Sequence, residues 1–393
     1  MKNAFLEDIC HIVIGKTPLR SQKEYWGKGN KWLSISDMQN KYIYETKEEI
    51  TDKGVMDCNC KLIPEDTLLL SFKLSIGKMA FNKVPLFTNE AIVALTIKDE
   101  NMLNKHYLYY ALKSVDLLAS TDRAVKGATL NKEKLRRIKV PITDLIVQER
   151  IVGILDKAQS LIDKRKQTIA ELNKLIMSVF YTSFADNSLA DRFELKECIE
   201  IPLNAGWSPV CSQNNQGIPV FSLANLTGEG LSTKITKFYD ENLPTKGSDL
   251  KAGDIVISRS NTRDLVGRVG LYEGTPSRVI YPDLMIRIRI KQDYLNSIYF
   301  FYYLISISKV IRNLAHGSNE SMVKISQSKL LSIPVIIPPK ALQDKFAEQV
   351  QNIKDQKQRV QEHLEQLEQN FDSLLHRAFT GQLNINDPIT IGK

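Results

Sequence analysis

One short segment of the chain, Ser258–Asp264, concentrates side chains that recognise other molecules through directed hydrogen bonds. It reads Ser-Arg-Ser-Asn-Thr-Arg-Asp. Arginine pairs with the edge of guanine or with phosphate, and asparagine pairs with the edge of adenine. Arg259, Arg263 and Asn261 therefore suit a loop that reads DNA. Any one of these side chains alone is also typical of a solvated surface, and only the set indicates DNA.

Comparable sets recur at corresponding places in the chain. The segment Ser71–Lys78 is the counterpart of the first segment, and the loops Arg123–Thr129 and Gly317–Ser321 form a second pair. Charged and amide side chains that recur in this way favour contact with an extended polyanion. The candidate DNA-binding residues are Lys73, Ser75, Lys78, Arg123, Lys126, Thr129, Arg259, Asn261, Arg263, Arg268, Ser318 and Asn319.

The motifs of the common catalytic classes are absent from the sequence. It contains no Gly-x-Gly-x-x-Gly, no Gly-x-x-x-x-Gly-Lys-Ser/Thr, no His-Glu-x-x-His and no Asn/Asp-Pro-Pro-Tyr/Phe. The last of these is the tetrapeptide expected of an enzyme that methylates base amino groups. The histidines and the five cysteines lack metal-ligand spacing, and an odd number of cysteines without a Cys-x-x-Cys pair indicates free thiols. We therefore predict no catalytic residue and no metal site in this chain.

Composition and charge narrow the class of protein. The chain has 393 residues, of which 43% are hydrophobic and 25% charged, as in soluble proteins with more than one domain. Its formal charge of +8 is a moderate basic excess that suits a polyanionic partner. The N-terminus carries acidic residues where a signal peptide needs an apolar core, and the most apolar segment, Ile298–Ile307, covers about half a bilayer. We expect a soluble cytoplasmic protein without a membrane segment.

An internal repeat positions the candidate loops. Lys134–Phe184 recurs at Lys329–Phe379 with a constant displacement of 195 residues (329 − 134). Upstream the likeness is looser: Gly15-Lys-Thr-Pro18 corresponds to Gly206-Trp-Ser-Pro209, and the displacement drifts between 188 and 193. The repeat predicts two equivalent units that share a scaffold and differ in their loops.

Each copy of the repeat begins with an extended piece marked by proline, Ile138–Pro141 or Ile333–Pro339, and continues as a long helix. Apolar side chains then alternate at steps of three and four over roughly five heptads, which is the pattern of a coiled coil. One such stripe is also typical of a helix packed on its own domain, but two matching stripes favour pairing of the helices. The predicted helix-pairing residues are Ile151, Leu155, Ile162, Ile169, Leu172, Ile176, Phe346, Val350, Ile353, Val360, Leu364, Leu367 and Phe371.

The regions before the long helices mix strand patterns with short helical patterns at Asn104–Ser114 and Ser297–Ile311, which predicts an α+β fold. Because the tyrosine clusters 107–110 and 299–303 fall in these helices, we predict that they are core rather than a platform for stacking bases. The predicted division is a first recognition domain at 1–133, a repeated region with its long helix at 134–184, a linker at 185–194, a second recognition domain at 195–328, a second repeated region with its helix at 329–379, and a tail at 380–393.

Taken together, these features resemble the specificity subunits of Type I restriction-modification enzymes over nearly the whole chain. The resemblance is carried by Gly-x-Thr/Ser-Pro near the start of each unit, by Leu70-Ser-Phe-Lys-Leu-Ser-Ile-Gly-Lys78, by Gly127-Ala-Thr-Leu-Asn131, and by the duplicated extended piece and long helix. The second unit departs from the pattern. Its segment 258–264 lacks the Ser-Phe-Lys-Leu-Ser string, and Gly317-Ser-Asn stands in place of Gly-Ala-Thr.

The resemblance implies two tandem target recognition domains, each reading one half of an asymmetric, interrupted site in double-stranded DNA. It also implies that the two long helices pair as an antiparallel coiled coil that spaces the half-sites. The implied partners are two methyltransferase (modification) subunits, which bind S-adenosylmethionine, and restriction/translocase subunits, which use ATP and Mg. This chain would bind no cofactor itself; it would supply DNA specificity and a scaffold.

Two other classes of protein remain open at this point. A coiled-coil adaptor would use the duplicated domains to bind proteins and would be indifferent to DNA. A nuclease or a fused methyltransferase would act without a partner, which the missing motifs disfavour.

Overall fold

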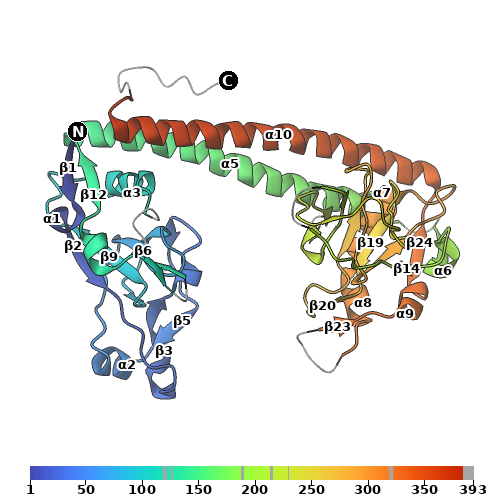
Figure 1. Cartoon of the computed structure of the whole chain (residues 1–393), viewed down its shortest axis with the longest axis horizontal. Coiled ribbons are helices and arrows are strands. Elements are labelled where there is room, and N and C mark those ends of the chain that lie inside the picture. The colour runs from blue at the N-terminus through green and yellow to red at the C-terminus, as the bar shows by residue number, and fades with distance from the viewer. Residues whose placement is uncertain are drawn as a thin grey trace. The chain divides into compact units, whose positions relative to one another are not determined.

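The structure is a computed structural model of the chain (Figure 1). It describes residues 1–117, 122–124, 127–186, 190–212, 216–228, 230–317 and 322–383, with the backbone alone for 122–124 and 127–129. The chain forms two compact units: unit 1 is Met1–Lys164 with the residues from Leu364 onward, and unit 2 is Arg165–His363. Each long helix has one end in unit 1 and the other in unit 2.

Unit 1 is built on a five-stranded sheet in the order β2-β9-β6-β7-β4, accompanied by a three-stranded sheet in the order β5-β3-β8. Its central strand β6 reads Leu-Leu-Leu-Ser and is buried along its whole length, as expected of a strand covered on both faces. The elements are β1 (Lys2–Phe5), α1 (Leu6–Ile9), β2 (Cys10–Ile14), β3 (Trp26–Leu33), β4 (Tyr42–Ile43), β5 (Glu48–Ile50), α2 (Asp52–Asp57), β6 (Leu68–Ser71), β7 (Met79–Asn82), β8 (Phe87–Thr88), β9 (Ile92–Ile97), α3 (Lys105–Ser114), β10 (Asp122–Ala124), β11 (Gly127–Thr129), α4 (Lys132–Arg136), β12 (Lys139–Ile142) and α5 (Leu145–Ser183).

Unit 2 repeats this plan around a four-stranded sheet in the order β14-β22-β19-β21. Its elements are β13 (Asp191–Glu194), α6 (Leu195–Cys198), β14 (Asn204–Ala205), β15 (Ile218–Pro219), β16 (Leu226–Thr227), β17 (Gly230–Leu231), β18 (Phe238–Tyr239), β19 (Ile255–Ser258), β20 (Ser260–Asn261), β21 (Val269–Leu271), β22 (Met285–Ile288), α7 (Ser297–Ser306), α8 (Ser308–Asn313), β23 (Val323–Lys324), α9 (Gln327–Leu331), β24 (Pro334–Ile337) and α10 (Lys340–Thr380). The helical pattern predicted at Ser297–Ile311 is therefore two helices, α7 and α8.

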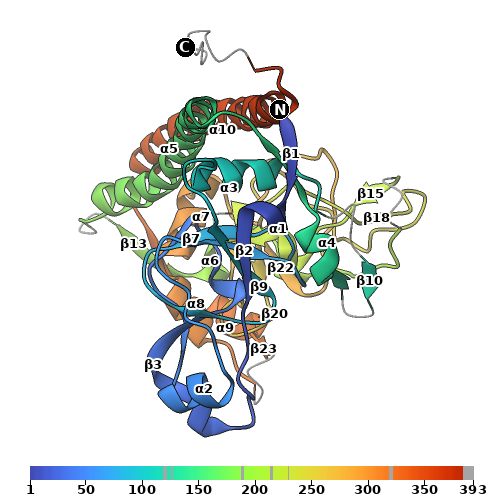
Figure 2. The same cartoon turned by 90° about the vertical axis from the view of Figure 1, so that its left-hand side faces the viewer.

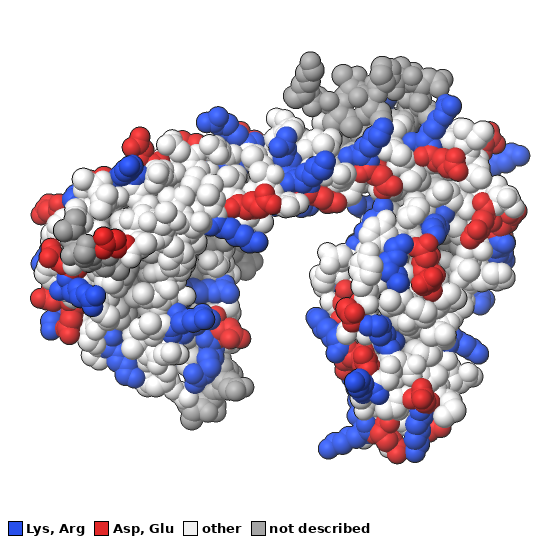
Figure 3. Space-filling view, turned by 180° about the vertical axis from the view of Figure 1, so that it is seen from behind, with Lys and Arg blue, Asp and Glu red and all other residues white. Residues whose placement is uncertain are grey.

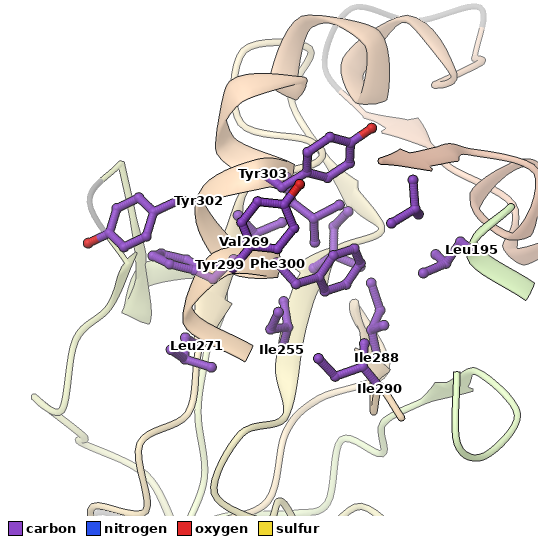
Figure 4. Packing of buried hydrophobic residues seen from close by; sticks show 14 of the residues in the cluster. Leu195, Ile255, Val269, Leu271, Ile288, Ile290, Tyr299, Phe300, Tyr302 and Tyr303 are labelled. Atoms are coloured by element: carbon purple, nitrogen blue, oxygen red, sulfur yellow. The ribbon is translucent and has the colours of Figure 1, made fainter. Parts of the chain in front are cut away.

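The core of unit 2 lies between α7 and its sheet. Tyr299, Phe300 and Tyr303 of α7 pack in one buried cluster with Ile255 of β19 and Ile288 of β22 (Figure 4). In unit 1 the tyrosines 107 and 110 of α3 are likewise fully buried. The prediction that these tyrosine clusters are core is confirmed.

The helices α3 and α7 begin in the same way. The side chain of Asn104 accepts hydrogen bonds from the backbone N–H groups of His106 and Tyr107, and Asn296 caps α7 with the equivalent pair of bonds. Such a cap satisfies backbone donors that have no partner inside the helix. The start of each helix is thus encoded by one asparagine.

The first strand of each unit pairs with the extended piece before its long helix. β1 is antiparallel to β12, and β13 is antiparallel to β24. The predicted linker 185–194 therefore ends in a strand, Asp191–Glu194. Sequence analysis did not predict this strand because three of its four side chains are exposed, so it lacks an apolar pattern. Backbone pairing with β24, rather than an apolar face, holds the strand in place.

The two long helices pair antiparallel. Within unit 2, Lys357 Nζ of α10 donates to Asn173 Oδ1 of α5 at 2.7 Å, whereas Phe346 lies 5.5 Å from Phe180 between ring centroids. Contacts that move back along α10 as they advance along α5 define an antiparallel pair. In unit 1, α3 lies against both long helices (Figure 2). Tyr110 OH donates to Asp156 of α5, and its ring contacts Phe371 of α10. The predicted α+β fold with tandem domains and paired long helices is confirmed.

Most of the predicted helix-pairing residues are buried. Ile151, Leu155, Ile162, Ile176, Phe346, Val350, Ile353, Leu364, Leu367 and Phe371 are buried, and Ile169, Leu172 and Val360 are half-buried. Phe180 and Phe184 also contact Phe346 but were not in the predicted set. Phe180 lies in the last turn of α5 and Phe184 follows directly after the helix, and both belong to the buried core cluster of unit 2.

Candidate nucleic-acid interface

The two segments proposed to read DNA occupy the same place in the two units. In unit 1 the backbone N–H of Ser71 donates to Lys78 O at 2.9 Å, which closes a hairpin loop over residues 72–77. In unit 2 the N–H of Ser258 donates to Arg268 O at 2.8 Å and closes the loop 259–267. We call these the hairpin loops. Lys78 and Arg268 are thus equivalent residues on equivalent frames.

A glycine ends each hairpin loop. Gly77 and Gly267 have φ angles of 90° and 76°, in the left-handed region that side chains disfavour. Their N–H groups donate back to Ser71 O and Ser258 O, both at 2.9 Å. The glycines let both loops return to the sheet through the same turn, although unit 2 has the longer loop.

The second pair of candidate loops lies next to the first pair. The N–H of Leu130, just after β11, donates to Phe72 O at 3.0 Å. In unit 2 the N–H of Ile325 donates to Arg259 O at 2.8 Å, and β20 pairs with β23. Folding therefore brings together, in each unit, two segments that lie far apart in the sequence.

The candidate side chains of unit 1 line the hairpin loop. Lys73 is half-buried, with Nζ 5.3 Å from the ring centroid of Phe72. Ser75 is exposed and Lys78 is half-buried. Arg123 and Thr129 belong to β10 and β11, where only the backbone is described, and Lys126 lies outside the described residues.

The candidate side chains of unit 2 differ in their exposure. Arg263 is exposed, and Arg259, Asn261 and Arg268 are half-buried. Asn261 Oδ1 accepts a hydrogen bond from the N–H of Thr262 at 2.9 Å. Ser318 and Asn319 lie outside the described residues. Two basic residues near this loop were not predicted from the sequence. Lys324 is exposed and lies opposite Ser260 in the β20–β23 strand pair, and Arg312 lies on α8. Neither belongs to a motif.

The Gly-x-Thr/Ser-Pro motif lies at the same end of each sheet, because β2 and β14 end where the hairpin loops begin. Its hydroxyl donates to a carboxylate in both units, Thr17 to Glu90 and Ser208 to Asp283. A Cβ on Gly15 would lie 2.2 Å from Thr88 O, which leaves room only for glycine. The motif thus fixes the backbone beside the hairpin loop rather than offering free side chains.

The carboxylates that precede the central strands form ion pairs with lysine or arginine side chains. Asp66 bonds with Lys105 and Lys83, and these hydrogen bonds lower the pKa of its carboxyl group. Asp254, 1% exposed, accepts two hydrogen bonds from Arg289 at 2.6 Å. Both carboxylates lie before β6 and β19, at the opposite end of the strand from the hairpin loop. Figure 3 shows acidic and basic side chains interspersed on the visible face of both units, so charge alone does not mark the interface.

The described residues contain no group of three or more His, Cys, Asp or Glu side chains placed to hold a metal ion. All five cysteines are free, and burial raises the pKa of the Cys10 thiol to about 12 and that of Cys198 to about 11. No helix in the described part of the chain is long and apolar enough to cross a membrane.

Comparison with known proteins decides the family. The sequence profile of the Type I restriction modification DNA specificity domain matches residues 1–174 and again residues 188–369. The chain belongs to this family. It is a specificity subunit of the Type I restriction-modification class, a subunit type that is not catalytic.

Two similar proteins are specificity subunits from Methanocaldococcus jannaschii and Escherichia coli. The MjaIX specificity subunit of Methanocaldococcus jannaschii is 25% identical over 413 residues, covering 97% of this chain and 93% of the relative. The EcoR124I/EcoR124II specificity subunit of Escherichia coli is 32% identical over 155 residues, covering 37% of this chain and 38% of the relative. A solved chain from a study of complex assembly and conformational transition of the type I R-M system has 15% identity, covers 97% of this chain and 98% of its own length, and superimposes with a TM-score of 0.57. That likeness supports the specificity-subunit fold.

Proposed function

We propose that this specificity subunit recognises a bipartite, asymmetric site in double-stranded DNA, with each unit reading one half. The observation that carries the proposal is the pair of hairpin loops. They are closed by the same backbone hydrogen bonds but carry Phe-Lys-Leu-Ser-Ile-Gly in unit 1 and Arg-Ser-Asn-Thr-Arg-Asp-Leu-Val-Gly in unit 2. Two loops with the same backbone closure but different side chains suit the recognition of two different DNA sequences.

The two kinds of contact have different tasks. Lys and Arg contacts to phosphate give a sequence-independent attraction that weakens with salt. Contacts from Arg259, Asn261 or Lys73 to base edges, each worth about 1–3 kcal/mol, set the sequence. The neighbouring segments support the loops through backbone hydrogen bonds, and in unit 2 the exposed Lys324 adds a basic side chain beside the loop.

We propose further that the subunit is a scaffold for two methyltransferase subunits and for restriction/translocase subunits in the cytoplasm. Those subunits would bind S-adenosylmethionine, ATP and Mg. The near-identical register of the two repeated regions supports two equivalent partner sites. A helix as long as α10, with 41 residues, spans about 60 Å and would space the half-sites at a constant distance.

The test uses the chain together with its methyltransferase partner. Retention of a specific duplex and of an unrelated duplex is measured at rising salt. The specific duplex should stay bound at salt concentrations that release the unrelated one, because base contacts do not depend on counterion release. Equal release of both duplexes, with the partner still bound, would favour a protein-binding adaptor and reject the proposal.

A further inference from the structure

We propose that a small pocket beside the hairpin loop of unit 2 holds one phosphodiester group of the DNA backbone. The inference rests on the proposed function. The pocket has a volume of about 210 Å³. One water takes about 30 Å³ of liquid volume, and sites for drug-sized ligands begin at about 300 Å³. The pocket therefore suits a small polar group in place of a few waters.

The pocket wall is built from four parts of unit 2. Gly228 follows β16, Asp264 lies in the hairpin loop with Arg268 directly after it, Ile305 comes from α7, and Ser308 and Arg312 come from α8. Two of these side chains carry a guanidinium group, whose planar fork of donors matches the oxygens of a phosphate. The donor set is that of an anion site.

The two arginines keep most of their donors available. Arg268 Nη1 donates to Leu226 O and Arg312 Nε donates to Ser308 O, both at 3.4 Å, the long end of hydrogen-bond distances. Within the described residues, no carboxylate forms an ion pair with either group. Among the described residues that line the pocket, Asp264 is the acidic one, and it is exposed. The described lining thus carries two positive charges and one screened negative charge, a balance that favours an anion.

Gly267 links the pocket to the loop residues that are proposed to contact bases. A Cβ added there would lie 2.8 Å from Ile311 Cγ2 and 3.7 Å from Arg312 Cγ, so the glycine lets α8 pack against the end of the loop. A phosphate held by Arg268 and Arg312 would fix the loop on the duplex. Arg259, Asn261 and Arg263 would then meet base edges from a constant distance, because backbone contacts set the register of a DNA-binding protein.

The first experiment compares Arg312→Gln with Lys309→Gln, in the complex with the methyltransferase partner. Lys309 also lies on α8, is exposed and does not line the pocket. Arg312→Gln should weaken binding of specific and unrelated duplexes alike, by about tenfold at moderate salt. It should also lower the slope of log affinity against log salt by about 0.9, the loss of one phosphate contact. Lys309→Gln should change neither quantity, and Arg268→Gln should repeat the Arg312 result.

The second experiment locates the phosphate. Duplexes with a single neutral methylphosphonate are scanned across the half-site of unit 2. A methylphosphonate at one position should weaken DNA binding by the unaltered subunit but should not further weaken DNA binding by the Arg312→Gln variant.

Three results would overturn the pocket assignment while leaving the proposed function intact. In each, the unaltered complex still prefers its specific duplex. Arg312→Gln and Arg268→Gln keep the original affinity and slope, or Lys309→Gln loses as much as they do. Alternatively, inorganic phosphate stabilises the subunit through Arg312 while DNA binding does not depend on that residue, which assigns the pocket to free phosphate. If the unaltered complex shows no preference, the proposed function itself fails.

Discussion

The side chain of Gln148 accepts a hydrogen bond from the backbone N–H of Asn104 at 2.9 Å and ties the start of α5 to the cap of α3. Its amide nitrogen donates to Met102 O at 2.8 Å and to Thr143 O at 2.7 Å. The residue is fully buried. The bonds to Asn104 and Met102 hold the start of α5 to the segment before α3, and the bond to Thr143 closes on the residues that lead into α5.

Gln343 makes the same contacts in unit 2. Its oxygen accepts from the N–H of Asn296 at 2.8 Å, and its nitrogen donates to Tyr294 O and Pro338 O at 3.0 and 2.7 Å. It is also fully buried. The repeated glutamine is therefore a joint between domain and helix.

Replacing Gln148 by leucine should destabilise unit 1 by about 2–3 kcal/mol, because the N–H of Asn104 and two carbonyls would lose their partner in a buried site. Denaturant unfolding of the chain measures this. Glu149→Ala, at the exposed neighbouring position, is the matched control and should stay within about 0.5 kcal/mol. Equal effects of the two substitutions would contradict the role of the joint.

Two glycines of unit 1 should respond to alanine with opposite signs. Gly15→Ala should cost about 3 kcal/mol or more, because its Cβ would lie 2.2 Å from Thr88 O. Gly153, exposed in α5 with nothing within 4 Å of an added Cβ, should gain up to about 1 kcal/mol from alanine. The thermal unfolding midpoints of both variants test these two predictions. An unchanged midpoint for Gly15→Ala would show that position 15 does not require glycine for steric reasons.

Exchanging the hairpin loop 259–267 for a loop of another sequence should alter one half of the recognised site and leave the other half and the gap unchanged. The reason is that its frame is closed by Ser258 and Arg268 within unit 2 alone. Mapping the methylated bases in DNA modified by the complex shows which half of the recognised site has changed and whether the gap has. A changed gap with both halves intact would reject this loop as the reader.

Unit 1 should lose stability as the pH falls from about 7 to 5.5. Burial and then the nearby Lys41 ammonium lower the pKa of His106 below its usual 6.5, and Asp156 opposes them. The unfolded chain therefore binds the proton more readily than the folded one, so the stabilisation present above pH 6.5 is lost as the pH drops toward the folded pKa. His106→Gln should show a smaller drop in unfolding midpoint over this range. The same drop in both proteins would exclude His106 as its cause.

Several features of this protein could be predicted because they are written in local patterns. The constant displacement between Lys134–Phe184 and Lys329–Phe379 shows the duplication, and the apolar steps of three and four show the long helices. The asparagine caps and the proline-marked strands are equally local. These signals depend on neighbouring residues, which the order of the sequence displays directly.

What only the tertiary structure decided is which distant residues meet. The strand Asp191–Glu194 exists because β24 offers it a backbone edge, and the sequence carries no apolar pattern for it. The hydrogen bond from Ile325 to Arg259 places the hairpin loop beside the strand before α9, and the packing of α8 on Gly267 brings Arg312 to the pocket. Backbone pairing and side-chain packing between remote segments depend on three-dimensional proximity. The sequence therefore determined the kind of protein and its two equivalent units, and the fold determined which loops and arginines form one surface.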